Sequence, residues 1–276
     1  FEDGKIVIDE ITPKNRFGDM FTDKTNYHSQ SVGKSIASYI LGHAICKGYV
    51  ESIDAKINDW PVLKNTLYHD QKIIDLINMR AGDQKYLNSN RFFDSNRAVT
   101  NPTIKSAMEN ELKNSKKSKV KWNYNNLLPH IILNYIIHKV GEDKFQKLLD
   151  EVFREKAKTE YDAHFVETEI SNSADRSITN TLMATRYDYL RIAKAMLDDW
   201  QNDTCEGKYL KTLYERKVKK NRDYRDKQEA FSITKSYGGF FHLDPYGMKN
   251  RHIFIMDGYG GQTLTIDFDK KRIVTT

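Results

Sequence analysis

The chain has 276 residues, of which 39% are hydrophobic and 12% aromatic, a composition typical of a folded protein with a sizeable core. It carries 44 basic and 38 acidic side chains, a formal net charge of +6, but much of the excess lies in two lysine-rich runs, residues 113–121 and 215–227. Those runs hold no nucleic-acid-binding motif, and no stretch approaches the roughly 18 apolar residues of a membrane helix, so we expect neither a nucleic-acid partner nor an integral membrane segment.

The first elements expected along the chain are a strand and a long helix. Residues 1–10, FEDGKIVIDE, are predicted to form a strand, and no charged and apolar leader of the signal-peptide type stands before them in this chain. Apolar residues then recur at helical spacing from about Ser31 to Lys47, and Gly48 follows as a typical helix terminator. We therefore predict a helix that begins near Ser31.

The middle of the chain, from Asp54 to about Lys227, is predicted to be mostly helix or loop. Convincing strands return only at the C-terminal end, where β-branched and aromatic residues alternate or run together. The predicted helices are 71–79, 101–112, 126–141, 142–156 and 185–200, and the predicted strands lie within 236–244, 251–269 and 271–276.

These elements predict an α+β fold, with an antiparallel sheet formed by N- and C-terminal strands, flanking helices and a large, mostly helical inserted subdomain. We place the discontinuous sheet subdomain at residues 1–55 and 226–276, and the helical subdomain at residues 56–225. The active site is expected at the interface of the two subdomains.

The two cysteines and eight histidines give no sign of a metal site. Cys46, in the predicted helix, and Cys205, in a polar loop, could pair in principle, but we interpret them as free thiols. Neither belongs to a C-x-x-C motif. The histidines are scattered, so we expect no metal and no cofactor. His28 lies shortly before the predicted helix, and a loop histidine satisfied by the backbone is the simpler interpretation of it.

A serine and a lysine at the start of the predicted helix could act as a nucleophile and its base. Ser31 and Lys34 would share one helix face, so a neutral Lys34 amine could accept the hydroxyl proton of Ser31. Burial or a neighbouring cation would have to lower the lysine pKa from its usual value of about 10.4. The same S-x-x-K spacing begins at Ser118 and Ser232, but only the first opens an amphipathic helix. The alternative is a helix-start serine beside a surface lysine.

A second motif, Y-x-N, is formed by Tyr124 and Asn126 immediately before an apolar helical stretch. The tyrosine hydroxyl could relay a proton, and the asparagine amide could bind a substrate carbonyl or orient the lysine. The alternative is loop packing with an asparagine helix cap. The same spacing recurs at Tyr86 and Asn88.

Glycines interrupt one of the C-terminal strands. Gly258, Gly260 and Gly261 would weaken the strand, but they allow a ligand or another backbone to come close. Free N–H groups along this edge could complete an oxyanion hole. The alternative is a glycine bulge that serves tight packing.

Taken together, these segments resemble a family of serine hydrolases that includes class C β-lactamases, DD-peptidases, esterases and nylon-oligomer hydrolases. The likeness runs over nearly the whole chain, in the order of the family's motifs. The segments that carry it are DGKIV, HSQSVGKSIASYILGHAICKGYV, SIDAKINDWP, IIDLINMRAGD, WNYNN, TRYDYLRIAKAML and GYGGQTLTIDFDKKRIV.

The resemblance assigns roles to the residues of the first two motifs. It implies that Ser31 is the acylated nucleophile, that Lys34 is its base, and that Tyr124 is the proton relay. Asn126 would be the residue that orients the substrate.

The resemblance also assigns the third motif, to Tyr259, Gly260 and Gly261. The oxyanion hole would be formed by the backbone N–H groups of Ser31 and Gln262. Many members of the family have lysine or histidine where Tyr259 stands, and a lysine there would meet a substrate carboxylate. Because a phenol carries no positive charge at neutral pH, we expect neutral substrates.

The function expected from the sequence is therefore a serine hydrolase that acts through an acyl-enzyme on a small-molecule ester or amide. The alternatives are β-lactamase or DD-peptidase activity, or a catalytically silent ligand-binding protein on the same scaffold. The resemblance points to a periplasmic or secreted protein, and the oligomeric state does not follow from the sequence.

Overall fold

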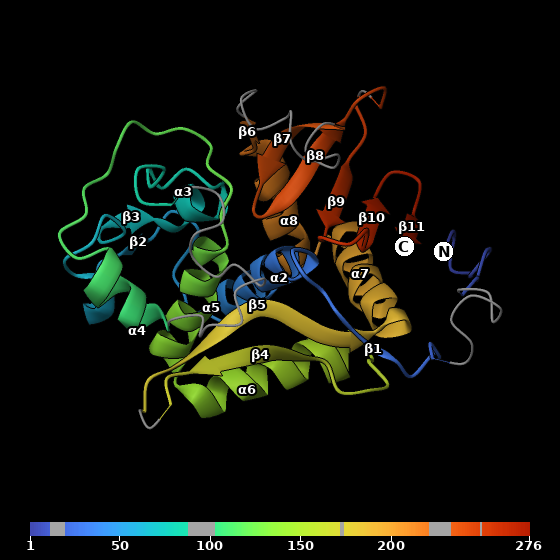
Figure 1. The fold of residues 1–276 in the computed structure, drawn as a ribbon. Helices are drawn as coiled ribbons and strands as arrows, with labels where there is room; N and C mark the ends of the chain where they lie inside the picture. Colours follow the sequence, from blue (N-terminus) through green and yellow to red (C-terminus); the bar gives the residue numbers. More distant parts are fainter. Residues whose placement is uncertain (12–19, 88–102, 172–173, 221–232, 249) are drawn as a thin grey trace.

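A computed structural model shows two antiparallel sheets with helices between and beside them (Figure 1). It describes residues 1–11, 20–87, 103–171, 174–220, 233–248 and 250–276. Within these residues, the larger sheet has six strands in the order β11-β10-β9-β8-β7-β6. The smaller sheet has three strands in the order β1-β5-β4, and β2 pairs with β3 alone.

Most of the strands are short, and two long helices come directly after the last strand of the smaller sheet in the sequence. No helix in the described ranges is both long and apolar enough to span a bilayer. The strands are β1 Asn26–His28, β2 Lys56–Ile57, β3 Gln71–Lys72, β4 His164–Glu169, β5 Arg176–Thr185, β6 Val218–Lys219, β7 Thr234–Gly238, β8 Phe241–Pro245, β9 Ile253–Asp257, β10 Thr263–Asp267 and β11 Arg272–Thr275. The α-helices are α2 Val32–Cys46, α3 Ile73–Ile77, α4 Ile104–Ser106, α5 Leu127–Val140, α6 Glu142–Asp150, α7 Arg186–Gln201 and α8 Cys205–Glu215, with shorter 3₁₀ or π turns at Pro61–Leu63, Ala107–Glu111 and Glu151–Lys156.

The six-stranded sheet packs one face against α7 and α8 through aromatic side chains. The indole of Trp200 stacks on Phe268 with ring centroids 4.3 Å apart, and Phe254 meets the same indole at 5.8 Å. Neighbouring strand residues point to opposite faces of a sheet. Since Phe254 faces these helices, Ile255 and Asp257 of β9 face the other side.

Helix α2 lies in the middle of the molecule, between the two sheets (Figure 1). Every residue from Val32 to Ala44 is buried, which agrees with a helix that is apolar or small almost all the way round. Gly33 allows α2 to approach β5, because a Cβ at this position would lie 1.8 Å from the carbonyl oxygen of Asn180. Any larger residue at position 33 would push the helix away from the sheet.

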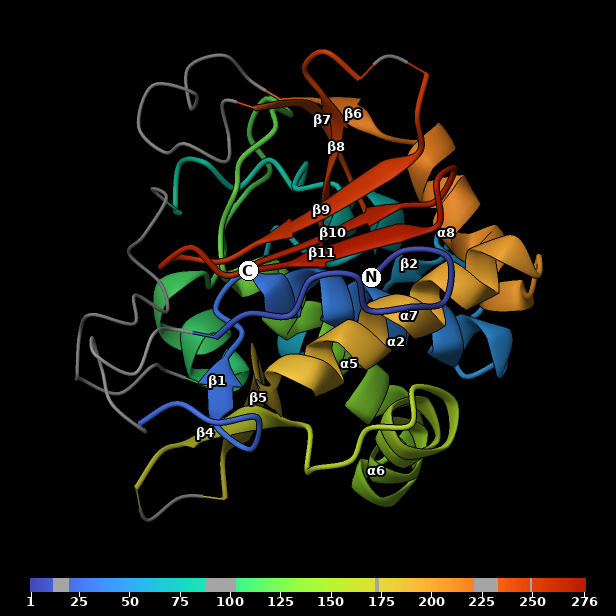
Figure 2. The same cartoon turned by 90° about the vertical axis from the view of Figure 1, so that its right-hand side faces the viewer.

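The predicted α+β class, with antiparallel sheets and flanking helices, is confirmed. The contribution of the N-terminus to the sheet is smaller than predicted, although this segment runs beside β11 (Figure 2). Glu2 makes isolated bridges with Lys5 and Arg272, and Phe1 hydrogen-bonds with the backbone of Ile273. A turn through Gly4, with φ +85°, bends the chain back before an extended strand can form.

Strands also occur in the middle of the chain, where the sequence predicted almost none. β4 and β5 form an antiparallel pair with an irregularity between Phe165 and Glu167. Their sequences, HFVETE and RSITNTLMAT, are rich in charged and small polar residues, so the alternation that identifies a strand is weak. Packing of β5 against α2 and α5 therefore determines that these residues form strands.

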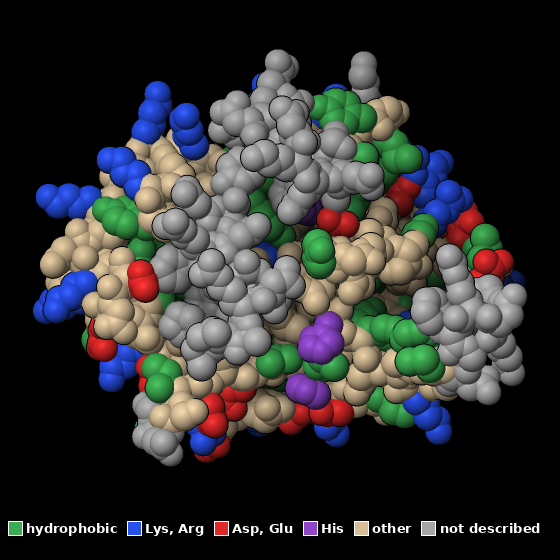
Figure 3. Space-filling view, in the orientation of Figure 1, with side chains coloured by type: hydrophobic (Ala, Val, Ile, Leu, Met, Phe, Trp, Pro, Cys, Tyr) green, Lys and Arg blue, Asp and Glu red, His purple; other side chains and the backbone are tan. Residues whose placement is uncertain are grey.

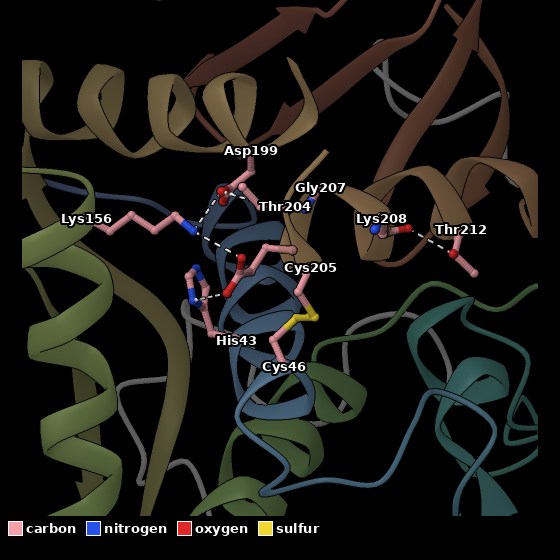
Figure 4. Close-up of a disulfide and its surroundings, with 10 residues drawn as sticks. His43, Cys46, Lys156, Asp199, Thr204, Cys205, Gly207, Lys208 and Thr212 are labelled. Carbon is pink, nitrogen blue, oxygen red and sulfur yellow. Dashed lines mark hydrogen bonds and ion pairs between the residues drawn. A yellow bond between two sulfur atoms is a disulfide. The ribbon is translucent and has the colours of Figure 1, made fainter. Parts of the chain in front are cut away.

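The prediction of two free thiols is wrong, because Cys46 and Cys205 form a disulfide (Figure 4). Cys46 is the last residue of α2 and Cys205 the first of α8, 159 positions away along the chain. Their Cα atoms lie 5.8 Å apart, within the range that a disulfide requires. The pairing depends on the packing of α8 against α2, which no local sequence pattern reveals.

Candidate active site

Ser31 stands at the start of α2, directly after a constrained turn. Gln30 has φ +48°, a left-handed conformation that is uncommon for residues other than glycine and that often marks functional sites. Ser29 ties this turn to β5, since its N–H donates to the carbonyl of Leu182 at 2.8 Å and its Oγ accepts from the N–H of Leu182 at 2.7 Å. The backbone that presents Ser31 is thus held to β5 by two hydrogen bonds.

Lys34 lies one helical turn after Ser31 and is almost completely buried, with 1% of its surface exposed. Its Nζ donates to the Oγ of Ser31 at 2.7 Å. Burial lowers the pKa of Lys34 to about 7, because the charged form loses its hydration. His130 of α5 adds no positive charge, since burial and the nearby Lys34 lower its pKa to about 3. A neutral amine can therefore face the serine hydroxyl near neutral pH.

Tyr124 completes the group, from the segment that leads into α5. Its hydroxyl hydrogen-bonds with Ser31, and the Nζ of Lys34 lies 4.9 Å from the centroid of its ring. Burial raises the pKa of Tyr124 far above its usual value, so the phenol stays protonated at neutral pH. The structure thus brings Ser31, Lys34 and Tyr124 together, although 90 residues separate Lys34 from Tyr124 in the numbering.

A buried carboxylate that the sequence analysis did not single out holds the segment around Tyr124. Asp83 accepts from the side-chain amides of Asn123 at 2.8 Å and of Asn125 at 3.1 Å. The Oδ1 of Asn125 in turn accepts from the backbone N–H of Leu127, at the first turn of α5, at 3.1 Å. Buried polar groups that are fully hydrogen-bonded specify one conformation. This network therefore positions Tyr124, and its sequence signal was the run of three asparagines around the tyrosine.

The remaining residue of the second motif, Asn126, is the N-cap residue of α5, and its side chain makes no capping hydrogen bond to the helix. The alternative interpretation, an asparagine cap, is therefore wrong for Asn126, and Asn125 has that role instead. In the second Y-x-N sequence, the hydroxyl of Tyr86 accepts from the N–H of Lys116 at 3.1 Å, and Asn88 lies outside the described residues.

The glycine-rich turn after β9 packs against the segment that leads to Ser31. A Cβ on Gly258 would lie 2.8 Å from the carbonyl oxygen of Ser29, so this close approach requires glycine. The side-chain amide of Gln262 donates to the carbonyl of His28 at 3.3 Å.

The other members of the predicted third motif are more exposed. Tyr259 exposes 75% of its surface, while Gly260 and Gly261 have φ values of +104° and +96°. The turn as a whole therefore lies beside the nucleophile, but Tyr259 is not enclosed with Ser31.

A second buried lysine lies close to Tyr124 on the sheet side. The Nζ of Lys220 is 2.7 Å from the Nδ1 of His242 and also contacts the hydroxyl of Thr234. The imidazole of His242 is 6.2 Å from the ring of Tyr124, centroid to centroid. Burial lowers the pKa of Lys220 to about 7 and that of His242 well below its usual value. Sequence patterns missed both residues because only the pairing of β6 with β7 and of β7 with β8 brings them together.

Other candidates do not contribute to this group. Ser118, of the second S-x-x-K sequence, donates its hydroxyl to the carbonyl of Gly82 at 2.8 Å, and Ser232 lies outside the described residues. A cavity of about 420 Å³ lies beside Trp60 and Asn134, away from Ser31. In the described ranges, no three histidine, cysteine or acidic side chains are grouped to hold a metal ion.

Solved structures share this arrangement of elements. The sequence matches no protein-family model and no curated protein. A D-amino acid amidase from Ochrobactrum anthropi superimposes with a TM-score of 0.62 at 14% identity, over 95% of this chain and 78% of the amidase. A penicillin-binding protein from Bacillus halodurans gives 0.60 at 13% identity over 92% and 80% of the two chains. A class C β-lactamase from Rhodobacter sphaeroides gives 0.56 at 13% identity over 92% and 80%. The chain thus has the fold of the serine β-lactamases and penicillin-binding proteins, as its sequence motifs suggested.

Proposed function

We propose that this chain, which has a β-lactamase-like fold, is a serine hydrolase that cleaves a small-molecule ester or amide through an acyl-enzyme on Ser31. The observation that carries the proposal is the 2.7 Å contact between the Oγ of Ser31 and a lysine whose charge is suppressed by burial. A buried, neutral lysine can serve as the base of a serine nucleophile without the help of a histidine. Tyr124, hydrogen-bonded to the same serine, supplies the second proton-transfer group.

The proposed reaction begins when the neutral amine of Lys34 takes the hydroxyl proton of Ser31. The Oγ then attacks the substrate carbonyl, and the N–H groups of Ser31 and Gln262 are the proposed donors to the resulting oxyanion. Tyr124 passes a proton to the departing alcohol or amine as the bond to it breaks, and recovers that proton from Lys34. Water next attacks the acyl-enzyme and gives up a proton through the same groups, which releases the acid and restores Ser31. Asn126 is proposed to orient the substrate carbonyl group.

Ester or amide hydrolysis is favoured over β-lactam or peptidoglycan chemistry. The third motif has Tyr259 in place of a lysine or histidine, and this side chain is mostly exposed. One structural neighbour is described as a D-amino acid amidase, and other neighbours as β-lactamases or a penicillin-binding protein, so the fold alone does not decide between them. β-Lactamase or DD-peptidase activity is the second candidate.

The test is labelling with a serine-directed alkyl phosphonate, followed by intact-protein and peptide mass spectrometry. We expect one adduct, located on Ser31 and lost in Ser31→Ala, while a panel of acyl esters is hydrolysed only by the unmodified enzyme. Ser118→Ala is the matched control, because its hydroxyl has a structural partner and its loss should leave labelling unchanged. An adduct on another serine would contradict the assignment of Ser31 as the nucleophile. No labelling and no hydrolysis would contradict the proposal as a whole and favour a ligand-binding protein.

A further inference from the structure

Asp257 is an acidic residue on the site side of the sheet, and neither motif nor resemblance assigned it a role. In the pairing of β8 with β9, His242 stands opposite Ile255. Directly opposed residues share a sheet face, and so do residues two apart on one strand. Asp257 therefore lies on the same face as His242, whose ring neighbours that of Tyr124.

The position of Asp257 at the end of β9 also places it beside the turn that precedes Ser31. The next residue, Gly258, approaches the carbonyl of Ser29 so closely that a Cβ would not fit. Figure 3 shows this face of the molecule in the orientation of Figure 1, where α2 lies below β8 and β9. A carboxylate at this strand end can thus meet a substrate bound to Ser31.

The carboxylate of Asp257 has no hydrogen-bond or ion-pair partner among the residues that the structure describes. The side chain is partly exposed. Lys220 is the cation that acts on it electrostatically, but the Nζ of Lys220 is engaged with His242 and Thr234. An uncommitted, half-buried charge in a catalytic site is expected to have a partner in the ligand.

The charges around Asp257 leave room for a cation. Burial raises the pKa of Asp257 to about 6, so it is mainly ionised at pH 7. The cation that acts on it is Lys220, after β6. His242 on β8 interacts electrostatically with both Lys220 and Lys34 of α2, and burial lowers the pKa values of all three basic groups. Tyr124 stays protonated. The carboxylate is therefore the one group among these that carries most of its charge at neutral pH.

Building on the proposed hydrolase function, we propose that Asp257 binds an ammonium group of the substrate, so that the preferred substrates are esters or amides of amino-bearing acids such as α-amino acids. A charge-assisted hydrogen bond in a partly desolvated site is stronger than one between neutral groups. The same carboxylate repels substrates that carry their own carboxylate. The exposed Tyr259 alone led us to expect substrates without a carboxylate, and Asp257 narrows these to substrates that carry an ammonium group.

The test compares benzyl esters of alanine, in both enantiomers, with benzyl propionate and the monobenzyl ester of succinate at pH 7. An α-amino group with a pKa near 7.7–8.0 is mostly protonated there. We expect kcat/KM for one alanine ester to exceed that for the propionate by about tenfold or more, and the succinate to be the poorest. In Asp257→Asn the ratio of alanine to propionate ester should fall close to one. The control Asp203→Asn, at an exposed position in the turn before α8, should keep the wild-type ratio.

Binding without turnover separates this inference from the hydrolase proposal. Calorimetric titration of Ser31→Ala should show tighter binding of the alanine ester than of benzyl propionate, and the difference should vanish in Ser31→Ala with Asp257→Asn. Such binding in a protein that hydrolyses neither ester would sustain the role of Asp257 and overturn the hydrolase proposal. Hydrolysis with no preference for the ammonium ester in the wild type, or with a preference for the succinate, would overturn the role of Asp257 alone. The comparison of the esters in the wild-type enzyme tests the role of Asp257 even if the Asp257→Asn variant folds poorly.

Discussion

The two ends of α2 differ in whether a buried ionisable side chain has a partner of opposite charge. At the N-terminal end, Lys34 is buried against Ser31 and the ring of Tyr124, and it forms no ion pair with any described carboxylate. At the C-terminal end, His43 lies 3.2 Å from a carboxylate oxygen of Glu206, as Figure 4 shows. Helix α2 thus carries a lysine without an ion pair at one end and, at the other, a histidine paired with a carboxylate of α8.

The cluster at the C-terminal end is extensive, and a disulfide anchors it. Lys156 bridges Asp199 at 2.7 Å and Glu206 at 3.2 Å, and the hydroxyl of Tyr39 donates to Asp199 at 2.5 Å. The hydrogen bond from His43 holds the pKa of Glu206 well below its usual range. Glu206 therefore stays ionised at neutral pH.

One buried helix can thus contribute to the proposed reaction at one end and to stability at the other. Where a partner is supplied, a buried group can keep its charge, as Glu206 does beside His43. Where the partner is withheld, burial removes the charge, and the pKa of Lys34 falls to about 7. We therefore expect substitutions at the first end to act on rate and those at the second end to act on stability.

The largest expected effect is that of Lys34→Arg. Guanidinium remains protonated at all accessible pH values, so the variant cannot take the proton of Ser31. We expect kcat/KM for a neutral acyl ester to fall by roughly 10,000-fold, the upper end of acid–base contributions. Lys47→Arg, just beyond the other end of the helix and paired with Glu151, should change it less than about twofold. Near-normal turnover in Lys34→Arg would exclude lysine as the base.

Tyr124→Phe should have the next largest effect. It removes the hydroxyl that hydrogen-bonds with Ser31 and keeps the ring that packs beside Lys34. We expect kcat to fall by roughly 100-fold or more, with a smaller change in KM.

The matched control for this variant is Tyr209→Phe. Its hydroxyl is paired with that of Ser38 on α2, at 2.8 Å, in a buried position away from Ser31. This substitution should lower the free energy of unfolding by about 1 kcal/mol and leave kcat unchanged. Equal kcat values in the two variants would reduce Tyr124 to a packing residue.

Sequence patterns predicted the parts of the site that depend on local geometry. Ser31 and Lys34 lie one turn apart on one helix, so their contact follows from helical spacing alone. Tyr124 required the order of motifs along the whole chain, since no spacing links it to Ser31. Both assignments of role remain predictions, which the variants above test.

The features that sequence patterns missed all depend on long-range contacts. The disulfide joins residues 159 positions apart, and Asp257 becomes a candidate only through the register of β8 and β9. The exposure of Tyr259 likewise depends on the shape of the turn after β9. Periodicity says which residues share a face of one element, but it does not say which face of another element lies opposite.

The pH dependence should also follow from the N-terminal end of α2. Only the neutral form of Lys34 can accept a proton, so kcat/KM for a neutral ester should fall about tenfold for each pH unit below about 7 and level off above it. The same shift makes the contribution of Lys34 to stability rise with pH between about 7 and 10.5, because the unfolded chain binds the proton that the folded chain has lost. A rate profile from pH 5 to 9 that stays flat would contradict a lysine base.

The smallest effect on rate is expected from removal of the disulfide in the double variant Cys46→Ser, Cys205→Ser. The bond closes a loop across 159 positions, so its loss gives the unfolded chain more freedom and should lower the free energy of unfolding by about 2–4 kcal/mol. The ion pair of His43 on α2 with Glu206 on α8 remains to hold the two helices together, so the N-terminal end of α2 should keep its geometry. We therefore expect kcat/KM to change less than about twofold while the urea midpoint falls. The measurement is a urea titration beside an ester assay, and the single variant His43→Ala offers a second way to weaken the same end. If the double variant loses activity in proportion to its stability under conditions where it is fully folded, then the two ends of α2 are coupled, and the division between chemistry and scaffolding along this helix does not hold.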